Sequence, residues 1–332
     1  MTKNVVTTII AAGLVAGCGS SPQQAPMKPM TLRVNVFPGA SNLALFAGID
    51  RGIFAKYGLT IELLNTPNSE EQRAGLARGA FEIAHSAIDN AVAMVEMARE
   101  EVIIVTGGDG GMNEFIVRPE ITKLADIRGK NLVVDAPNTA YALIARKVLK
   151  TNGLVDGRDY RLDPAGGTPL RVASMTEKPA SAAAMLNPPW SFIAQARGLK
   201  SLGRSIDIFG PYQASGAFVL RKWAGNNAEV LERYIAAYVE SVRTAMNATN
   251  RTAMIALLAT RLKLEPAIAE RTYETLMIPR FGLSADARFD MEGFRNVLAL
   301  RAEIEGSWGG QPPAPDRYLG LDYNERALKR IK

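Results

Sequence analysis

Apolar and polar residues along the first third of the chain predict strands and helices in alternation. Residues 31–37 (TLRVNVF) alternate with the period of a strand. Apolar residues at helical spacing then predict one helix over 43–57, with Ser41 as its N-cap and Gly58 as the residue that ends it. Residues 69–72 (SEEQ) form a capping-box pattern that opens another helix, ended by Gly79. Further strands are expected at 60–64, 81–84 and 102–106, and a helix at 90–99. This order predicts an α/β fold with parallel strands joined by right-handed crossovers.

A glycine-rich run at residues 107–111 (GGDGG) interrupts this pattern, and a second α/β set follows it. Strands are expected at 131–134, 160–162, 180–185 and 217–220, and helices at 140–150, from 169 with Thr168 as cap, and at 192–197. The chain beyond residue 228 is almost entirely helical in pattern, with helices at 228–246, 252–262, 266–276, 294–304 and 324–331. Two α/β halves predict two lobes with a cleft, and in such sheets ligands lie beyond the carboxyl ends of the strands.

The N-terminal residues have the layout of a secretory signal. Lys3 precedes an apolar stretch at 5–16, which is shorter than the ~20 residues that span a bilayer. The stretch ends in VAGC at Cys18, the only cysteine, and this tetrapeptide resembles a bacterial lipoprotein lipobox. An ordinary signal with an incidental cysteine is the alternative, but the following run GSSPQQAP has the composition of a flexible tether. We therefore expect a signal peptide at 1–17, lipidation of Cys18, a tether at 18–30, and a periplasmic, membrane-anchored protein.

Composition excludes several classes of function. The chain is 22% charged and 47% hydrophobic, which is typical of a globular protein. Its formal charge of +6 comes from scattered Lys and Arg with no basic run among aromatics, so nucleic acid is not an expected partner. A lipidated Cys18 leaves no thiol for a disulfide or for nucleophilic attack. Because there is one histidine, a zinc or iron site lacks ligands, and we expect no metal and no cofactor.

Four segments, in order, resemble one family of solute-binding proteins of ABC importers, the nitrate-, sulfonate-, taurine- and thiamine-pyrimidine-precursor type. Residues 43–59 (LALFAGIDRGIFAKYGL) have its alanine-rich helix followed by Gly-x-Phe and Gly-Leu-x-Ile. Residues 75–84 (GLARGAFEIA) match the next stretch, with Glu82 in place of the usual aspartate. Residues 124–130 (LADIRGK) resemble the entry to the second lobe, and residues 318–328 resemble the C-terminal tyrosine-x-aspartate helix.

The resemblance implies the two-lobed periplasmic-binding-protein type II fold. Each lobe is then a mixed or parallel sheet flanked by helices, with extra helices at the C-terminus. The implied organisation is a first lobe at 31–110, a second at 111–211, and a return to the first lobe with C-terminal helices at 212–332. The chain would cross between lobes near 107–113 and 209–215. The implied function is capture of a small molecule by hinge closure, as a monomer, for the permease and ATPase of an ABC importer.

Six loops that follow strands at the mouth between the lobes supply the candidate ligand-binding residues. These are Phe37, Ser41, Asn42, His85, Ser86, Asp89, Asn113, Asn138, Thr139, Tyr141, Asn187, Trp190, Tyr212 and Gln213. None of the loops contains Lys or Arg, although an anion-specific site often uses a bidentate arginine. We therefore expect a neutral or weakly basic planar solute, such as a pyrimidine precursor, stacked on an aromatic ring. The alternative is a sulfonate or carboxylate held by helix N-terminal amides near Asn42 or Thr139.

Each candidate also has a structural interpretation. Ser41, Asn42 and Thr139 fit helix caps, and Asp89 fits either a cap or a partner for a cationic part of the ligand. Trp190 fits packing under a turn shaped by the two prolines before it, and Phe37 fits the core. His85, the only histidine, fits a structural hydrogen bond as well as a ligand contact.

The rival to binding is catalysis, because some proteins of this fold are enzymes of pyrimidine or menaquinone biosynthesis. His85 and Ser86 are adjacent and point apart on an extended strand, so they do not form a triad. The chain has no Gly-x-Ser-x-Gly elbow, no phosphate-binding loop and no cysteine-rich iron motif. These absences favour a binding protein over an enzyme. A ligand sensor without a permease is a third possibility that the sequence leaves open.

Overall fold

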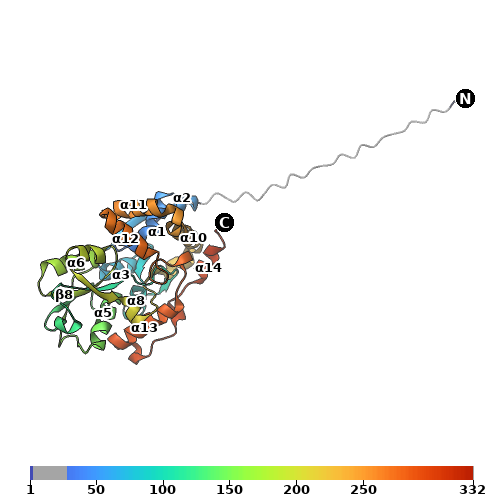
Figure 1. Ribbon diagram of the computed structural model, residues 1–332. Coiled ribbons are helices and arrows are strands. Elements are labelled where there is room, and N and C mark those ends of the chain that lie inside the picture. The colour runs from blue at the N-terminus through green and yellow to red at the C-terminus, as the bar shows by residue number, and fades with distance from the viewer. Residues whose placement is uncertain (3–27, 332) are drawn as a thin grey trace.

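Two five-stranded sheets form the framework of the protein in the computed structural model, which describes residues 1–2 and 28–331 (Figure 1). The first sheet has the order β2-β1-β3-β10-β4 and the second β7-β6-β8-β5-β9. The strands of the first sheet are β1 (Met30–Val36), β2 (Leu59–Asn65), β3 (Ile83–Ala87), β4 (Val102–Ile104) and β10 (Ser215–Leu220). Those of the second are β5 (Glu114–Val117), β6 (Asn131–Val134), β7 (Arg161–Pro164), β8 (Ser181–Leu186) and β9 (Lys200–Arg204). The α/β fold predicted from the sequence is confirmed.

Both sheets are mixed, which agrees with the mixed or parallel sheet that the resemblance implies for each lobe. The pairs β1–β2, β1–β3, β6–β7 and β6–β8 are parallel, but β10 and β5 run antiparallel to their neighbours. Each of these strands is the one that the chain enters directly after crossing from the other sheet. Ser215 starts β10 opposite Ala87 at the end of β3, and Glu114 starts β5 opposite Leu186 at the end of β8. The chain arrives at the carboxyl ends of the parallel strands and must therefore run back along them.

The two crossing segments lie side by side. The Asp109 backbone N–H donates to Ser215 Oγ over 3.0 Å, and the Ala214 N–H donates to the Asp109 carbonyl over 3.0 Å. The glycines of the first segment are needed because the loop at residues 280–288, between two C-terminal helices, packs directly against their backbone. A Cβ on Gly110 would lie 1.8 Å from the Arg280 carbonyl oxygen. This contact explains the glycine run that divides the sequence pattern.

Helices cover both sheets. They are α1 (Leu43–Asp50), α2 (Ile53–Lys56), α3 (Ser69–Ala77), α4 (Asp89–Met97), α5 (Ala140–Thr151), α6 (Thr168–Glu177), α7 (Trp190–Ala196), α8 (Ser205–Phe209), α9 (Arg221–Asn226), α10 (Ala228–Met246), α11 (Arg251–Leu262), α12 (Pro266–Leu276), α13 (Met291–Glu305) and α14 (Asp322–Leu328). The single helix expected over 43–57 is two helices, because Gly52 adopts a left-handed conformation with φ of 67°. The capping box at 69–72 is also wrong: Asn68 is the N-cap of α3, and its side chain accepts from the Glu71 N–H.

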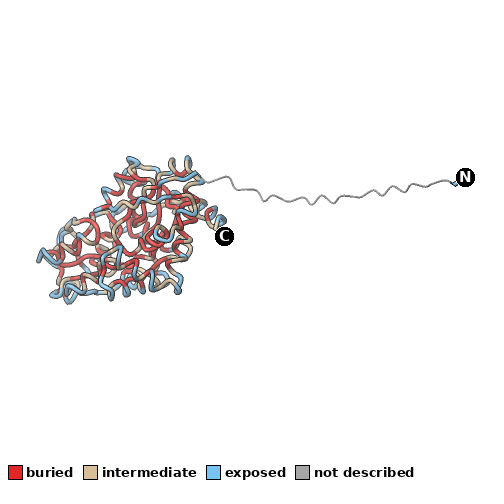
Figure 2. The backbone as a smooth tube through the Cα atoms, turned by 90° about the horizontal axis from the view of Figure 1, so that it is seen from above, coloured by how far each residue is buried: buried red, intermediate tan, exposed pale blue. Residues whose placement is uncertain are grey.

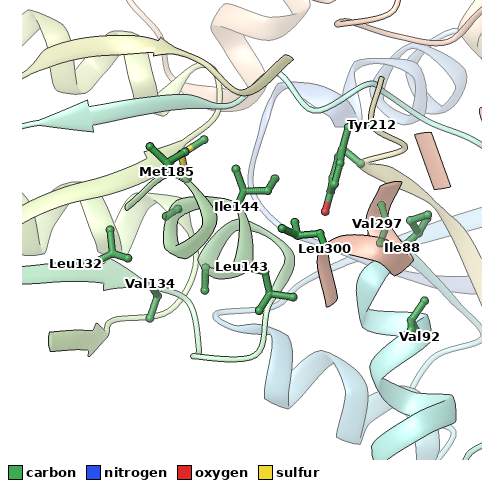
Figure 3. Packing of buried hydrophobic residues seen from close by; sticks show 14 of the residues in the cluster. Ile88, Val92, Leu132, Val134, Leu143, Ile144, Met185, Tyr212, Val297 and Leu300 are labelled. Carbon is green, nitrogen blue, oxygen red and sulfur yellow. The ribbon is translucent and has the colours of Figure 1, made fainter. Parts of the chain in front are cut away.

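Helix α13 packs over the junction between the two sheets. One continuous hydrophobic core joins Leu143 and Ile144 of α5 to Val297 and Leu300 of α13, with Tyr212 of the second crossing segment beside them (Figure 3). Lys147 of α5 also pairs with Glu303 of α13 over 2.5 Å. Buried residues, drawn in red, occur throughout the interior of the folded part of the chain (Figure 2). Helix α13 thus packs against a helix that flanks the second sheet.

The predicted N-terminal signal lies almost wholly outside the described residues. Of the expected signal at 1–17 only Met1 and Thr2 are described, Cys18 is not, and of the tether only residues 28–30 are. Within the described part of the chain no helix combines the length and the apolar character needed to cross a bilayer.

Candidate functional site

A cavity of about 60 Å³ lies between the two sheets. A water molecule needs roughly 10–15 Å³ on the same measure, so the cavity has room for a few water molecules or for a small solute. Its lining comes from both lobes and consists of Phe37, Pro38, Gly39, Ser41, Asn42, Ser69, His85, Ser86, Ala87, Asn90, Asp135, Thr139, Ala140, Tyr141, Thr168, Arg171, Asn187 and Ser215. Most of these residues follow the carboxyl ends of β1, β2, β3, β6, β7 and β8, where open α/β sheets bind ligands.

Eight of the candidate residues named from the sequence line this cavity. They are Phe37, Ser41, Asn42, His85, Ser86, Thr139, Tyr141 and Asn187. None of the three expected caps makes a capping hydrogen bond with its side chain. The Asn42 amide instead donates to the Phe37 carbonyl over 2.7 Å, and the Thr139 hydroxyl donates to the Ala136 carbonyl over 2.8 Å. Each of these hydrogen bonds joins two residues of the same loop and therefore stabilises the conformation of that loop.

Three other candidates lie outside the lining. Their side chains connect the two lobes or fix a crossing segment to a neighbouring helix. Asp89 forms a buried ion pair with Arg301 of α13. Trp190 Nε1 donates to the Pro38 carbonyl of the opposite lobe over 2.9 Å. Gln213 accepts from the Asp290 N–H over 2.7 Å, which fixes the second crossing segment to the start of α13.

The remaining three candidates also lie outside the lining. Tyr212 is 4% exposed and packs in the core shared by the lobes (Figure 3). The Asn138 side chain accepts from Arg73 Nη2 over 3.5 Å. Asn113 is fully buried in the first crossing segment, and neither polar atom of its side chain has a partner in the described part of the chain.

The sequence-based candidates do not include Arg171, the one arginine of the cavity lining. Its charge changes the kind of solute that the cavity is expected to bind. The loops contain no Lys or Arg, as expected, but Arg171 reaches the cavity from the first turn of α6. It is 2% exposed, Nη1 donates to the Met185 carbonyl over 2.5 Å, and Nη2 donates to Thr168 Oγ1 over 2.8 Å. Its Nε has no hydrogen-bond partner among the described residues, and Arg171 forms no ion pair within that part of the chain. Burial lowers the pKa of Arg171, and the charge of the Asp135 carboxylate opposes this shift in part. The signal in the sequence was the Thr168-x-x-Arg171 spacing, which puts both side chains on one helix face.

Asp135, also missed, is the one carboxylate of the lining and joins the two lobes. It follows β6 of the second sheet, and it accepts hydrogen bonds from the Ser69 N–H and hydroxyl at the start of α3, the latter over 2.5 Å. The Gly167 N–H donates to the Pro67 carbonyl over 2.7 Å beside it. These bonds, with that of Trp190, connect the two lobes around the cavity.

The wall from the first lobe is held by buried polar contacts. The Ser86 hydroxyl donates to the Gln72 Oε1 over 2.5 Å, and the Gln72 Nε2 donates to Asn35 Oδ1 over 2.8 Å. His85 Nε2 lies 2.8 Å from the Tyr234 hydroxyl of α10, and the His85 ring meets Tyr238 edge-on at 4.6 Å. The two neighbours on β3 are therefore held by different elements on opposite faces of the sheet.

Burial sets the charge of His85 and makes stability depend on pH. Burial lowers the pKa of His85 from 6.5 to about 3. Between these values the unfolded chain binds the proton and the folded chain does not, so stability is full above pH 6.5 and falls as the pH decreases. We expect the free energy of unfolding to fall by about 2 kcal/mol more between pH 7 and pH 5 in the wild type than in His85→Gln. Urea denaturation of both proteins at the two pH values measures this, and equal pH dependence would contradict it.

Comparisons with known proteins agree with this geometry. The model of the NMT1-like family matches residues 25–259. A protein of Brachyspira hyodysenteriae named as an ABC transporter periplasmic binding protein is 23% identical over 259 residues, covering 72% of this chain and 73% of that protein. The periplasmic nitrate-binding protein NrtA of Synechocystis PCC 6803 has a TM-score of 0.76 at 14% identity, covering 92% of this chain and 89% of that one. The desulfurization enzyme DSZB shares the fold with a TM-score of 0.61 at 15% identity, covering 90% and 99%.

Proposed function

The chain belongs to the NMT1-like family, and we propose that it is an extracytoplasmic protein that captures a small solute between its lobes and delivers it to an ABC importer. The observation that carries the proposal is the small cavity at the carboxyl ends of the strands of both sheets. A solute there touches both lobes at once. Hinge motion at the two crossing segments then opens and closes access to it.

The side chains of the lining support binding over catalysis. Ser86 follows His85 in the sequence, but its hydroxyl donates a hydrogen bond to Gln72. His85 Nε2 is hydrogen-bonded to the Tyr234 hydroxyl instead. A nucleophile and its base must lie within hydrogen-bond reach of each other, and these two side chains are held by different partners. Within residues 28–331 no three His, Cys, Asp or Glu side chains come together to hold a metal ion. We propose that the solute leaves the protein unchanged.

Arg171 favours an anionic solute over the neutral heterocycle. A buried guanidinium without a carboxylate partner is costly, and an anion in the cavity offsets that cost. The similarity in fold to a nitrate-binding protein agrees with this choice. The rings of Phe37 and Tyr141 in the lining also fit a planar group, so a pyrimidine-type solute is the second candidate.

A thermal-shift screen tests the proposed function. The probes are nitrate, methanesulfonate, acetate and 4-amino-2-methylpyrimidine. At a hundredfold its Kd a bound solute adds about 2.7 kcal/mol to the stability of the folded state, so at least one anion is expected to raise the melting temperature. Stabilisation by the pyrimidine alone would select the second solute class. If a wider screen of small molecules also gives no shift, solute capture is wrong.

We further propose that the protein acts as a monomer anchored to the membrane through a lipid on Cys18. The resemblance of residues 15–18 to a lipobox and the tether composition of residues 19–26 support the anchor. Radiolabelled palmitate is expected to enter the wild type in cells and not Cys18→Ala. Equal labelling of the two would contradict the anchor. Permease and ATPase genes beside this one would separate an importer from a sensor.

A further inference from the structure

His85 has two ring nitrogens with different surroundings. Nε2 lies 2.8 Å from the Tyr234 hydroxyl, while Nδ1 has no partner in the described part of the chain. His85 is one of the residues that line the cavity, and 9% of the residue is exposed. Since Nε2 is engaged by α10, Nδ1 is the nitrogen left to meet a solute.

Tyr234 decides which nitrogen of His85 carries the proton. The tyrosine is fully buried, and His85 is the only hydrogen-bond partner of its hydroxyl among the described residues. If Nε2 carried the proton, it would donate to the tyrosine oxygen and leave the tyrosine proton buried without an acceptor. That arrangement is disfavoured by a factor of about ten or more. The hydroxyl therefore donates to Nε2, and in a neutral ring the proton then sits on Nδ1.

We propose that Tyr234 fixes His85 as the neutral tautomer protonated on Nδ1, and that this N–H donates a hydrogen bond to an acceptor atom of the solute. The proposal rests on the proposed function and adds the chemistry of recognition. A fixed donor selects a solute that presents an oxygen or an unprotonated nitrogen at this wall, and it disfavours one that presents an N–H there. A site with a fixed hydrogen-bond donor discriminates strongly between solutes, because a solute without an acceptor at that position leaves the buried donor unpaired.

The surroundings keep His85 in this one state. The groups that face it from α10 are the two tyrosines, Tyr234 and Tyr238, and neither carries a charge at neutral pH. The charged groups of the lining are Asp135 and Arg171, of which the first already accepts from Ser69. Arg171 is also a donor without acceptor capacity. Two donors from opposite lobes thus favour a solute rich in acceptors.

The only histidine of the chain makes a direct test possible. The protein is labelled with ¹⁵N-histidine, without an affinity tag, and long-range ¹⁵N–¹H spectra then report the protonated nitrogen of His85 alone. We expect the proton on Nδ1 in the wild type at pH 7, and a shift towards protonation of Nε2 in Tyr234→Phe. A wild-type spectrum with the proton on Nε2 would overturn the proposal, even if Tyr234→Phe does not fold.

Two variants test the donor role with the same solutes. Asparagine places its amide near the position of Nδ1, and glutamine places its amide near that of Nε2. With methanesulfonate or nitrate as probe, we expect His85→Asn to keep most of the wild-type affinity and His85→Gln to lose about tenfold or more. Equal losses in the two variants, or no change in the Nδ1–H resonance when a probe binds, would overturn the donor role and leave solute capture intact. If no probe binds, the proposed function fails, while the spectrum still decides the tautomer.

Discussion

Replacing Arg301 with methionine is expected to lower the free energy of unfolding by about 3–5 kcal/mol, because it leaves the Asp89 carboxylate buried without its partner. Arg301 Nε donates to Asp89 Oδ1 over 2.9 Å, and Nη2 donates to Oδ2 over 2.6 Å. Both side chains are 2% exposed. Nη2 also donates to the Asn138 carbonyl over 2.8 Å, so this arginine of α13 holds α4 of the first lobe and a loop of the second.

Urea denaturation of matched variants checks this prediction. The double variant Asp89→Leu/Arg301→Met removes both charges, and we expect it to be more stable than Arg301→Met alone. Arg204 and Asp207 form an ion pair whose side chains are 45% and 53% exposed, so Arg204→Ala serves as the control and is expected to cost less than about 1 kcal/mol. A similar loss in Arg301→Met and Arg204→Ala would mean that the buried pair contributes no more than a surface pair.

This ion pair shows why a site residue is hard to assign from the sequence. Asp89 follows a strand at the mouth between the lobes, which is the right place for a ligand contact or a cap. Its partner is 212 residues away, on a helix that the sequence pattern predicts without indicating what it packs against. Local sequence spacing indicates on which element a residue lies. The tertiary fold determines which charged side chain pairs with it.

The fold was predicted well where periodicity is strong. The helices at 228–246 and 266–276 have the predicted bounds, because long amphipathic segments leave little ambiguity. Strands β5 and β9 were missed. β5 has an apolar run of only three residues, Phe115 to Val117, which is too short to distinguish a strand from other buried structure. β9 is an exposed edge strand that contains a glycine and shows no clear alternation. Their antiparallel pairing follows from the route of the chain between the lobes, which a local pattern does not contain.

The candidate site was predicted in outline because the carboxyl ends of strands converge in this fold. The loops that follow the strands contain Phe37, His85 and Asn187, which line the cavity. Arg171 and Ser69 also line it but lie outside those loops, in the first turns of helices. The neutral solute expected from the absence of basic loop residues therefore rested on an incomplete set of side chains. Including the first turn of each helix would have found the arginine.

Replacing Arg171 with methionine is expected to separate binding from stability. If the solute is an anion, losing the buried guanidinium costs about 2 kcal/mol or more of binding free energy, which is roughly a thirtyfold loss of affinity. Without solute the same change is expected to leave the free energy of unfolding unchanged or raise it by about 1 kcal/mol. The reason is that the guanidinium is 2% exposed and is satisfied by neutral partners, Met185 and Thr168, at only two of its nitrogens.

Isothermal titration with the anion that stabilises the wild type, together with urea denaturation, measures both effects in the same variant. Arg171→Lys keeps the charge but loses the planar fork, so its affinity is expected to lie between those of the wild type and Arg171→Met. Binding of 4-amino-2-methylpyrimidine, if it occurs, depends on the rings of the lining and is expected to change little. Unchanged anion affinity in Arg171→Met would remove the charge argument for the solute. A loss of stability as large as that of Arg301→Met would instead mean that Arg171 is a structural cation, since removing a residue kept for its ligand does not destabilise the empty fold.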